Sequence, residues 1–580
     1  MSDSTDWPRI ERAHPVARDR PATALAMALV AGAFAIVLAG MPSELFDLER
    51  HAAPKELALH ATALVCVPLL LRGWRRVRLG VVDAALAAFV IWSGVSALFA
   101  ANRWLSLRAF GVTFSGYIVY RAARRIAWGA DDERGALVGV DAMDPGRVNQ
   151  AGAGQAVWRV GRASAVLAGL AAAAITGASI GIAQAYGFDA EWLAARRAPG
   201  GTFGNRNFLA HVLAIAAPGM LLLAMLPLRG RARVLRWLAF AGLAAAAAAI
   251  VLTRSRAAWL GLAAGAGAML LLGAIGRGAL VGRLRAGAAG AAAVTVIIAV
   301  AAAVLLPNRL EWRSDSPYAE TLVRIGDFRE GSGRGRLIQY GNSLELIAYR
   351  PVLGLGPGNW FVHYPRVTEP GDPSFAGADP IPTNPWPSSD WVAFATERGP
   401  IGALLLLGAG VLAIVIVLRR LRQPAPAGTE AAPAGVALAG TLAAALVTGA
   451  FDAVLLLAAP SFYVFTTLGL LLPPTRPVVD RATGRRLGLG LRAGAVAIAV
   501  ALVLSSVGQV VAIRIAGTGS DRAALERAAH FDPGSHRLRL GLARRGGCSR
   551  RIPHARAAAA LMPHHAAPRR ALAACGERPE

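Results

Sequence analysis

The stretch Ala286–Leu306 reads AGAAGAAAVTVIIAVAAAVLL and holds 21 residues without one charged side chain. A helix needs about 20 apolar residues to cross the hydrocarbon core of a bilayer. Apolar runs of similar length recur along most of the 580-residue chain, which is 55% hydrophobic and has a mean hydropathy of +0.47. Because these runs are continuous rather than alternating, they argue against β-barrel spans. The sequence therefore predicts an all-α, polytopic membrane protein with about 12–13 transmembrane helices.

The predicted spans share this composition, although the second and the twelfth are short. They cover residues 22–41, 57–71, 80–100, 105–120, 163–183, 208–227, 235–252, 257–275, 286–306, 400–418, 434–457, 460–473 and 489–512. The resulting organisation is a segment 1–21, a transmembrane domain 22–475 with a long loop 307–399, a basic loop and last span 476–519, and a tail 520–580. A polar insertion, Asp131–Arg162, is expected to be flexible.

Arginine supplies nearly all of the net charge of +26, since Lys55 is the single lysine. The arginines cluster in short loops at alternate ends of the spans, which favours membrane topology over nucleic-acid binding. These loops are Arg72–Arg78, Arg121–Arg125, Arg229–Arg236, Arg277–Arg285, Arg419–Arg422 and Arg476–Arg486. They define the cytoplasmic face, so the N-terminus lies inside and the 307–399 loop and the tail lie outside. No cleavable signal is expected at the N-terminus.

Two short polar strings interrupt the apolar chain on the predicted outer face. Gly201–Asn207 reads GTFGNRN, and its amides Asn205 and Asn207 precede a span, so they either cap that helix or hold a polar headgroup. Thr253–Arg256 reads TRSR, and its two arginines, Arg254 and Arg256, lie at a membrane edge. Such arginines either extend to the lipid headgroups or clamp a phosphate or diphosphate through a planar set of donors.

The long outer loop holds further polar groups. Arg334 and Arg336 precede an amphipathic helix predicted over 337–349, and a glycine-rich turn follows at 354–360. That turn lacks the strand–turn–helix context of a dinucleotide site, so it is interpreted as a packed loop turn. Further on, Ser388-Ser389-Asp390-Trp391 and Glu397-Arg398-Gly399-Pro400 lead into the next span.

Taken together, these strings resemble the O-antigen ligase/polymerase superfamily of bacterial envelope enzymes. The resemblance covers roughly residues 22–475 and rests on four motifs in order. They are GTFGNRNFLA at 201–210, TRSRAAWLG at 253–261, the stretch from Arg336 through Tyr340 and RP at 350–351 to GLGPGNW at 354–360, and E-x-G-x-x-G at 397–402.

The resemblance implies a metal-independent glycosyltransferase of the GT-C type in the bacterial inner membrane, without a cofactor. Its donor would be a polyprenyl-diphosphate-linked glycan, and its acceptor a hydroxyl on lipid A-core, on a second glycan or on a protein. By matched position, Arg256 and Arg336 would bind the diphosphate. Further substrate-binding candidates are Arg254, Arg334, Asn205, Asn207 and Glu397.

One position departs from the family pattern. Members commonly carry His-Asn about nine residues before the glutamate of the last motif, where this chain has Ser388-Ser389. A serine at its ordinary pKa is a poor base. Asp390 or His363 could serve the acceptor instead, and loss of activity is the other possibility.

Several functions stay open at this level. Ligase and polymerase share the donor chemistry, and a protein O-glycosyltransferase of the same superfamily is a second enzymatic alternative. A non-catalytic scaffold or a transporter is the alternative from another class. The transporter is disfavoured because the middle of the spans carries almost no ionisable residue.

The tail differs from the rest of the chain. A helix ending at Asp532-Pro533 is followed about 30 residues later by a second version ending at Met562-Pro563, which resembles a degenerate pair of tetratricopeptide repeats. An unrelated helical hairpin fits nearly as well. Cys548 and Cys575 lie in a presumed oxidising compartment and could form a disulfide, whereas Cys66 is expected to be an apolar filler within a span.

Overall fold

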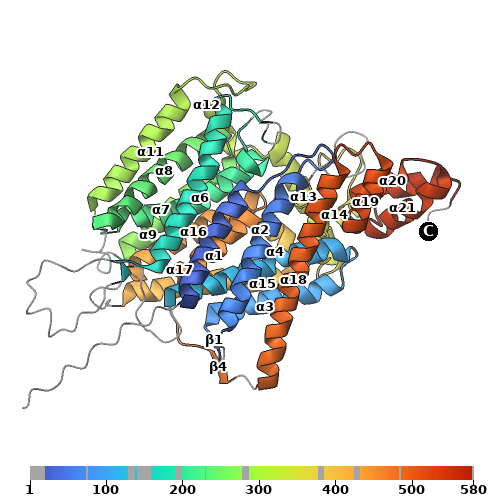
Figure 1. Cartoon of the computed structure of the whole chain (residues 1–580). Coiled ribbons are helices and arrows are strands. Elements are labelled where there is room, and N and C mark those ends of the chain that lie inside the picture. Colours follow the sequence, from blue (N-terminus) through green and yellow to red (C-terminus); the bar gives the residue numbers. More distant parts are fainter. Residues whose placement is uncertain are drawn as a thin grey trace, which may run out of the picture.

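The computed structural model describes most of the chain as a bundle of long helices with a small helical tail on one side (Figure 1). The described residues are 20–72, 76–128, 138–139, 159–190, 193, 198–226, 228, 230–276, 286–375, 384–423, 431–473, 475–482 and 485–577. Most of the predicted insertion 131–162 and the basic loop 277–285 lie outside the described residues.

Thirteen described helices correspond to the thirteen predicted spans, which confirms the all-α polytopic architecture. They are α1 (Arg20–Leu38), α2 (Glu49–Leu71), α3 (Val81–Leu98), α4 (Arg103–Trp128), α6 (Arg162–Ala185), α7 (Arg206–Met225), α8 (Arg233–Thr253), α9 (Arg256–Ile275), α11 (Ala286–Leu305), α15 (Asp390–Arg422), α16 (Ala431–Phe451), α17 (Ala458–Leu471) and α18 (Arg485–Ala516). Eleven are long and apolar enough to cross a membrane. The other two are α17, which has 14 residues, and α4, which is less apolar and carries five arginines.

The second helix begins earlier than predicted, at Glu49 rather than near residue 57. Its first two turns hold charged side chains that are satisfied inside the protein. Lys55 donates to the carbonyl oxygens of Ile36, Val37 and Ala39, and Glu56 pairs with Arg108 at 2.6 Å. Internal partners offset the cost of burying these charges, so polar residues extend the helix.

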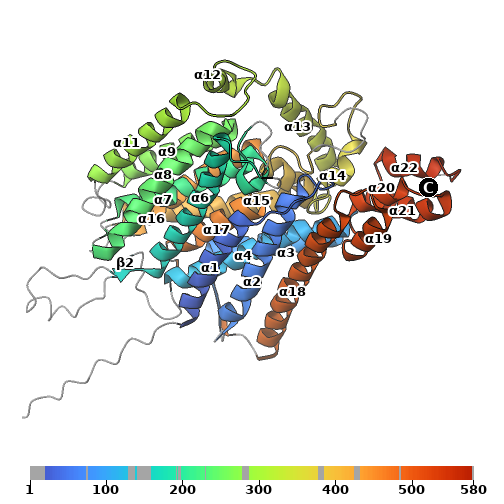
Figure 2. The ribbon, with the colours of Figure 1, turned by 45° about the horizontal axis from the view of Figure 1, so that its top comes forward.

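Helix α7 lies at the centre of the bundle, and nearly all of its side chains are buried. It packs against α6, α8, α9, α16 and α17, while α18 lies beside α2 at the periphery. At one end of the bundle the long loop forms α12 (Pro317–Val323), η3 (Arg324–Gly326), α13 (Gly331–Tyr349), α14 (Trp360–His363) and η4 (Tyr364–Arg366), as Figure 2 shows. The helix predicted over 337–349 is thus present and starts two turns earlier.

Two short strands that the sequence did not predict lie at the opposite end of the bundle (Figure 1). β1 (Arg76–Leu79) pairs antiparallel with β4 (Val479–Ala482), with Arg76 opposite Ala482. They join two of the basic loops, 72–78 and 476–486, which the sequence assigns to one face. The remaining short elements are β2 (Val138–Gly139), which pairs with β3 (Arg159–Val160), and the 3-10 turns η1 (Gly201–Phe203) and η2 (Gly230–Ala232).

A close backbone contact fixes the long loop to the bundle. Gly399, with φ of +70°, breaks α15 into two helical segments, and Gly354, also at φ +70°, lies against it. A Cβ on Gly354 would lie 2.5 Å from the Glu397 carbonyl carbon and oxygen, so no larger residue fits. Across this contact Leu355 N donates to Thr396 O at 3.0 Å and Gly356 N to Glu397 O at 2.8 Å. The glycine-rich turn is therefore packed, as predicted.

The tail consists of two successive helix pairs. The first is α19 (Arg522–Phe531) with α20 (His536–Ala543), and the second is α21 (Cys548–Leu561) with α22 (Ala566–Ala573). Leu525 and Ala528 pack on Ala512 and Ile513 of α18, which anchors the tail to the bundle.

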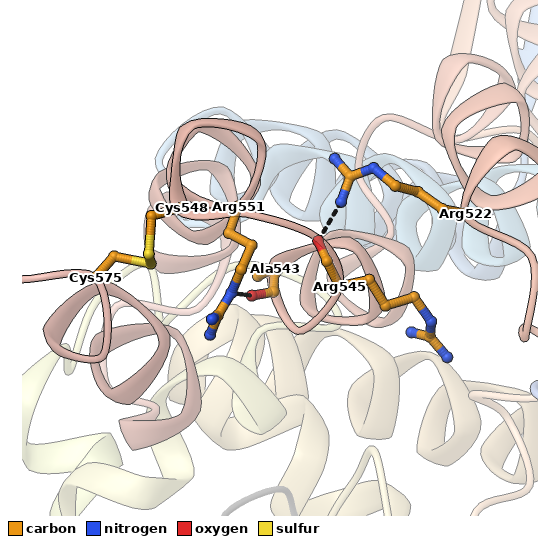
Figure 3. The surroundings of a disulfide bond; sticks show 6 residues. All are labelled: Arg522, Ala543, Arg545, Cys548, Arg551 and Cys575. Carbon is orange, nitrogen blue, oxygen red and sulfur yellow. Dashed lines mark hydrogen bonds between the residues drawn. A yellow bond between two sulfur atoms is a disulfide. The ribbon is translucent and has the colours of Figure 1, made fainter.

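A disulfide between Cys548 and Cys575, which the sequence leaves open, is present and joins the two ends of the second helix pair (Figure 3). Arg551 Nε donates to Ala543 O at 2.8 Å beside it, and Arg522 donates to Arg545 O. Cys66 is buried within α2 with its thiol free, as expected. The similarity to tetratricopeptide repeats stays a prediction.

Replacing Cys575 by Ser should destabilise the second helix pair by about 3–4 kcal/mol, because the bond closes a loop over a sequence separation of 27. The expected result is faster protease cleavage within 548–577 in the variant than in the unreduced wild type. Cys66→Ala is the matched control and should leave the cleavage rate unchanged. Three titratable thiols in the denatured, unreduced wild-type protein would contradict the disulfide.

Candidate functional site

The string 201–207 begins the candidate site at the N-terminus of α7. Asn205 is the N-cap of α7, and its side-chain oxygen accepts from Asn207 N at 2.8 Å. This bond leaves the Asn207 side chain available, and Asn207 Nδ2 donates to Asp452 Oδ2 at 2.9 Å. The sequence offered two roles for this string, helix capping and binding of a polar group. Asn205 caps the helix, whereas the Asn207 side chain bonds to another segment of the chain.

Asp452 lies in the turn between α16 and α17 and is largely buried. Besides Asn207, its carboxylate accepts from Ala453 N at 2.8 Å through Oδ1. His211, one helical turn after Asn207, is fully buried and brings Nε2 to 3.9 Å from Asp452 Oδ2. Neither ring nitrogen of His211 makes a well-formed hydrogen bond among the described residues. A carboxylate, an amide and an imidazole thus meet at this end of the bundle.

The two arginines of the string 253–256 have different surroundings. Arg254, at φ +53°, ends α8, and its guanidinium donates to Thr321 Oγ1 at 2.7 Å and pairs with Glu320 at 3.0 Å. Arg256 begins α9 and donates to Ser332 Oγ at 2.8 Å and to the Arg324 carbonyl oxygen. The charge of Arg254 is therefore neutralised where it holds α12, whereas the partners of Arg256 in the described residues are uncharged.

Helix α13 brings a second guanidinium to the same place. Arg336 is half-buried, and its buried Nε has no hydrogen-bond partner in the part of the chain that the structure describes. Arg336 is close enough to Arg256 to repel it, and Arg206 lies near Arg254 and Arg256. Arg336 also acts electrostatically on His211. Several positive charges thus surround one region beside the Asp452 carboxylate.

Tyr340 connects α13 to both neighbouring turns of the bundle. Its hydroxyl lies 2.8 Å from Ser388 O and 2.9 Å from Ala450 O, two residues before Asp452. Burial raises the pKa of Tyr340 to about 12, so the neutral phenol donates at neutral pH. Gln339 beside it accepts from both Ser388 N (3.1 Å) and Ser388 Oγ (2.9 Å). Ser388 is thus close to the arginines, with its hydroxyl bonded to an amide oxygen.

Asp390 is fully buried at the first turn of α15 and supports the Asp452 turn from behind. Its carboxylate accepts from Val454 N at 2.9 Å and from Leu455 N at 2.7 Å. These two amides follow Asp452 by two and three residues in the chain. Asp390 therefore holds the backbone of the turn that carries Asp452.

Glu397 and His363 contact other partners than Arg256 and Arg336. The buried Glu397 carboxylate pairs with Arg398 at 3.1 Å and accepts from Trp360 N at 3.3 Å. His363 lies beside Tyr349, and burial lowers the pKa of His363 to about 4. Tyr349 follows Arg336 by 13 residues, or about 20 Å along α13.

The structure thus brings Asn207, Arg256, Arg336 and Ser388 together, with Asp390 beneath them. Arg334 is exposed on α13, while Glu397 and His363 belong to the packing of the loop. Sequence reasoning missed His211 and Asp452 as site residues. The available signals were a histidine four residues after Asn207, on the same helix face, and an aspartate at the end of an apolar span.

Comparison with known proteins supports the resemblance. Residues 241–407 match the family model described as O-antigen ligase. The match runs from within α8 to within α15, so it includes Arg256, Arg336 and Ser388, while Asn207 and Asp452 lie outside it. No curated protein matches the chain.

Arg256 and Arg336 bring two guanidinium groups close together. They should bind an oxyanion, because arginine donates two parallel hydrogen bonds to phosphate oxygens. Arg256→Ala and Arg336→Ala should each weaken binding of inorganic pyrophosphate about tenfold, measured by titration calorimetry in detergent. Binding should also weaken with added salt. Arg366→Ala, near Tyr349 at the other end of α13, is the matched control. Equal affinity in all variants would exclude an anion site here.

Proposed function

We propose that this chain, which carries an O-antigen ligase domain at residues 241–407, is an inner-membrane glycosyltransferase. It would transfer a glycan from a polyprenyl-diphosphate carrier to an acceptor hydroxyl on the periplasmic face. The acceptor would be lipid A-core or a second glycan, as in a ligase or a polymerase. The observation that carries this proposal is the meeting of Arg256 and Arg336, from two distant segments, beside the Asp452 carboxylate.

The arginines suit the leaving group of this reaction. The bond between the sugar carbon and the diphosphate oxygen breaks, and negative charge develops on the diphosphate. Guanidinium donors already in place stabilise that charge without reorganisation during the reaction. The unpartnered Nε of Arg336 supplies a donor for this purpose, and Ser332 holds Arg256 in position.

Asp452 is the best-placed group to serve the acceptor. The acceptor oxygen bonds to the sugar carbon, and its proton must pass to a base. The Asp452 carboxylate accepts hydrogen bonds from Asn207 and from the Ala453 amide, and His211 Nε2 lies 3.9 Å from it. Ser388 is less suited, because its hydroxyl already binds Gln339. Asp390 acts as a positioning residue, through the Val454 and Leu455 amides.

The orientation of this site follows from the loop charges. The arginine-rich loops 72–78 and 476–486 are joined through β1 and β4 at the end of the bundle opposite the site. Short arginine-rich loops stay in the cytoplasm, so the site and the tail would face the periplasm. A lipid-linked donor flipped across the membrane would meet the arginines there.

The test is surface glycan in a deletion strain complemented at matched protein levels. Arg256→Ala, Arg336→Ala and Asp452→Asn should each lower glycan transfer by about 100-fold or more, because each removes a group that acts in the transition state. Glu345→Gln, an exposed carboxylate on α13, is the matched control and should behave as wild type.

The glycan pattern separates the alternatives. Core without chains indicates a ligase, single attached repeats indicate a polymerase, and loss of glycoprotein staining indicates a protein O-glycosyltransferase. Wild-type glycan in all three site variants would leave a non-catalytic scaffold and end the catalytic proposal.

A further inference from the structure

A second cleft lies where the tail meets the bundle, away from the arginines. Its cavity volume is about 80 Å³, which is several times the space that one water needs. Five helices, α2, α4, α18, α19 and α20, and the turn after α19 form its walls. The lining includes Glu49 of α2, Trp104 and Arg108 of α4, Gln509 of α18, and Phe531 and His536 of the tail.

Four buried polar atoms on this lining have no hydrogen-bond partner among the described residues. They are Glu49 Oε2, Gln509 Oε1, His536 Nε2 and Arg537 Nε. Gln509 and His536 are each more than nine-tenths buried, with 9% and 8% of their surface exposed. Leaving such atoms unpaired costs free energy, so a cluster of them at one cleft indicates a polar ligand or water that completes their bonds.

The same cleft exposes aromatic rings. Trp104 and Phe531 each keep 49% of their surface exposed, although both lie beside buried polar groups. The Cβ of Trp104 packs tightly against Gly534 of the tail, so the tail holds this side chain at the cleft. A flat apolar face next to hydrogen-bonding groups suits a sugar ring, which has C–H faces and a rim of hydroxyl groups.

The charges of the cleft argue against a phosphate ligand. Arg108 pairs with Glu56 at 2.6 Å, and Arg537 pairs with Glu49 at 3.1 Å. Asp532 adds a further carboxylate to the lining. Since both guanidinium groups are neutralised and an acidic group remains, a neutral polyhydroxyl ligand fits better than an anionic headgroup.

The Arg108–Glu56 pair also connects the cleft to the candidate site. Glu56 lines a smaller, mostly apolar cavity of about 30 Å³, which Phe208 and Leu457 line on its other side. Phe208 follows Asn207 in the chain, and Leu457 lies in the turn that begins with Asp452. The two cavities thus lie on either side of one ion pair, between the tail and the Asp452 turn.

We propose that the cleft between the tail and the bundle binds sugar residues of the acceptor glycan, and this inference rests on the proposed function. Trp104 and Phe531 provide the apolar faces, while Gln509, Glu49 and His536 bind hydroxyl groups. The tail would then complete a subsite and hold the acceptor while its reacting hydroxyl reaches Asp452.

The test uses the full-length protein in phosphatidylcholine nanodiscs, titrated with core oligosaccharide released by mild acid from the lipopolysaccharide of the native host. Wild type should bind, and Trp104→Ala and Gln509→Leu should each weaken binding about fivefold or more. Trp237→Ala, an equally exposed ring at the start of α8, is the matched control and should bind as wild type. Faster protease cleavage of the tail would show that Trp104→Ala releases the tail from the bundle. In that case Gln509→Leu, which nearly conserves side-chain size, decides the result.

Arg256→Ala separates this inference from the proposed function, because it should lose glycan transfer and still bind the oligosaccharide. Wild-type affinity in both cleft variants, or no binding by the wild type, would overturn the inference. A third result would also overturn it: native mass spectrometry finds a phospholipid bound to the wild type and lost in Trp104→Ala, and the oligosaccharide does not bind.

Discussion

The contact between Gly354 and Gly399 is the constraint on which the position of the 307–399 loop depends. Here two backbones approach so closely that neither residue admits a side chain, and the buried Glu397 carboxylate accepts from Trp360 N at the same place. This contact closes the 307–399 loop onto α15, at an entropic cost that the buried hydrogen bonds offset. This contact and the hydrogen bonds of Tyr340 hold α13 across the end of the bundle. The position of α13 in turn fixes the position of the Arg336 side chain.

The arginines near Arg336 have different roles. Arg254 has its own carboxylate, Glu320, and serves to hold the loop. Arg256 and Arg336 repel each other in surroundings that are partly shielded from water. An anion between them would offset that repulsion and accept from the Arg336 Nε, which has no hydrogen-bond partner among the described residues. Under the proposed function, this anion is the diphosphate leaving group.

Much of this arrangement could be predicted from the sequence, because span length and loop charge depend on local composition. The spans and the helix that ends at Tyr349 are examples. The role of Asp452 could not be predicted, since it depends on the pairing of α7 with the α16–α17 turn, which no local pattern encodes. The role of Asp390 could not be predicted either. From the sequence alone, a buried carboxylate that accepts from two backbone amides cannot be told from a catalytic carboxylate.

Lys55, the single lysine of the chain, contacts both α1 and the turn that precedes α7. A chain with 61 basic residues uses lysine once, and its compact ammonium is buried among backbone carbonyl oxygens. Its Nζ donates to the last carbonyl oxygens of α1 and lies 3.3 Å from Thr202 Oγ1, while Phe203 packs over it at 4.4 Å. These contacts hold the 201–203 turn on α1 and α2. That turn leads directly into α7, the helix that carries Asn207 and His211, so the Lys55 contacts link α1 and α2 to the start of this helix.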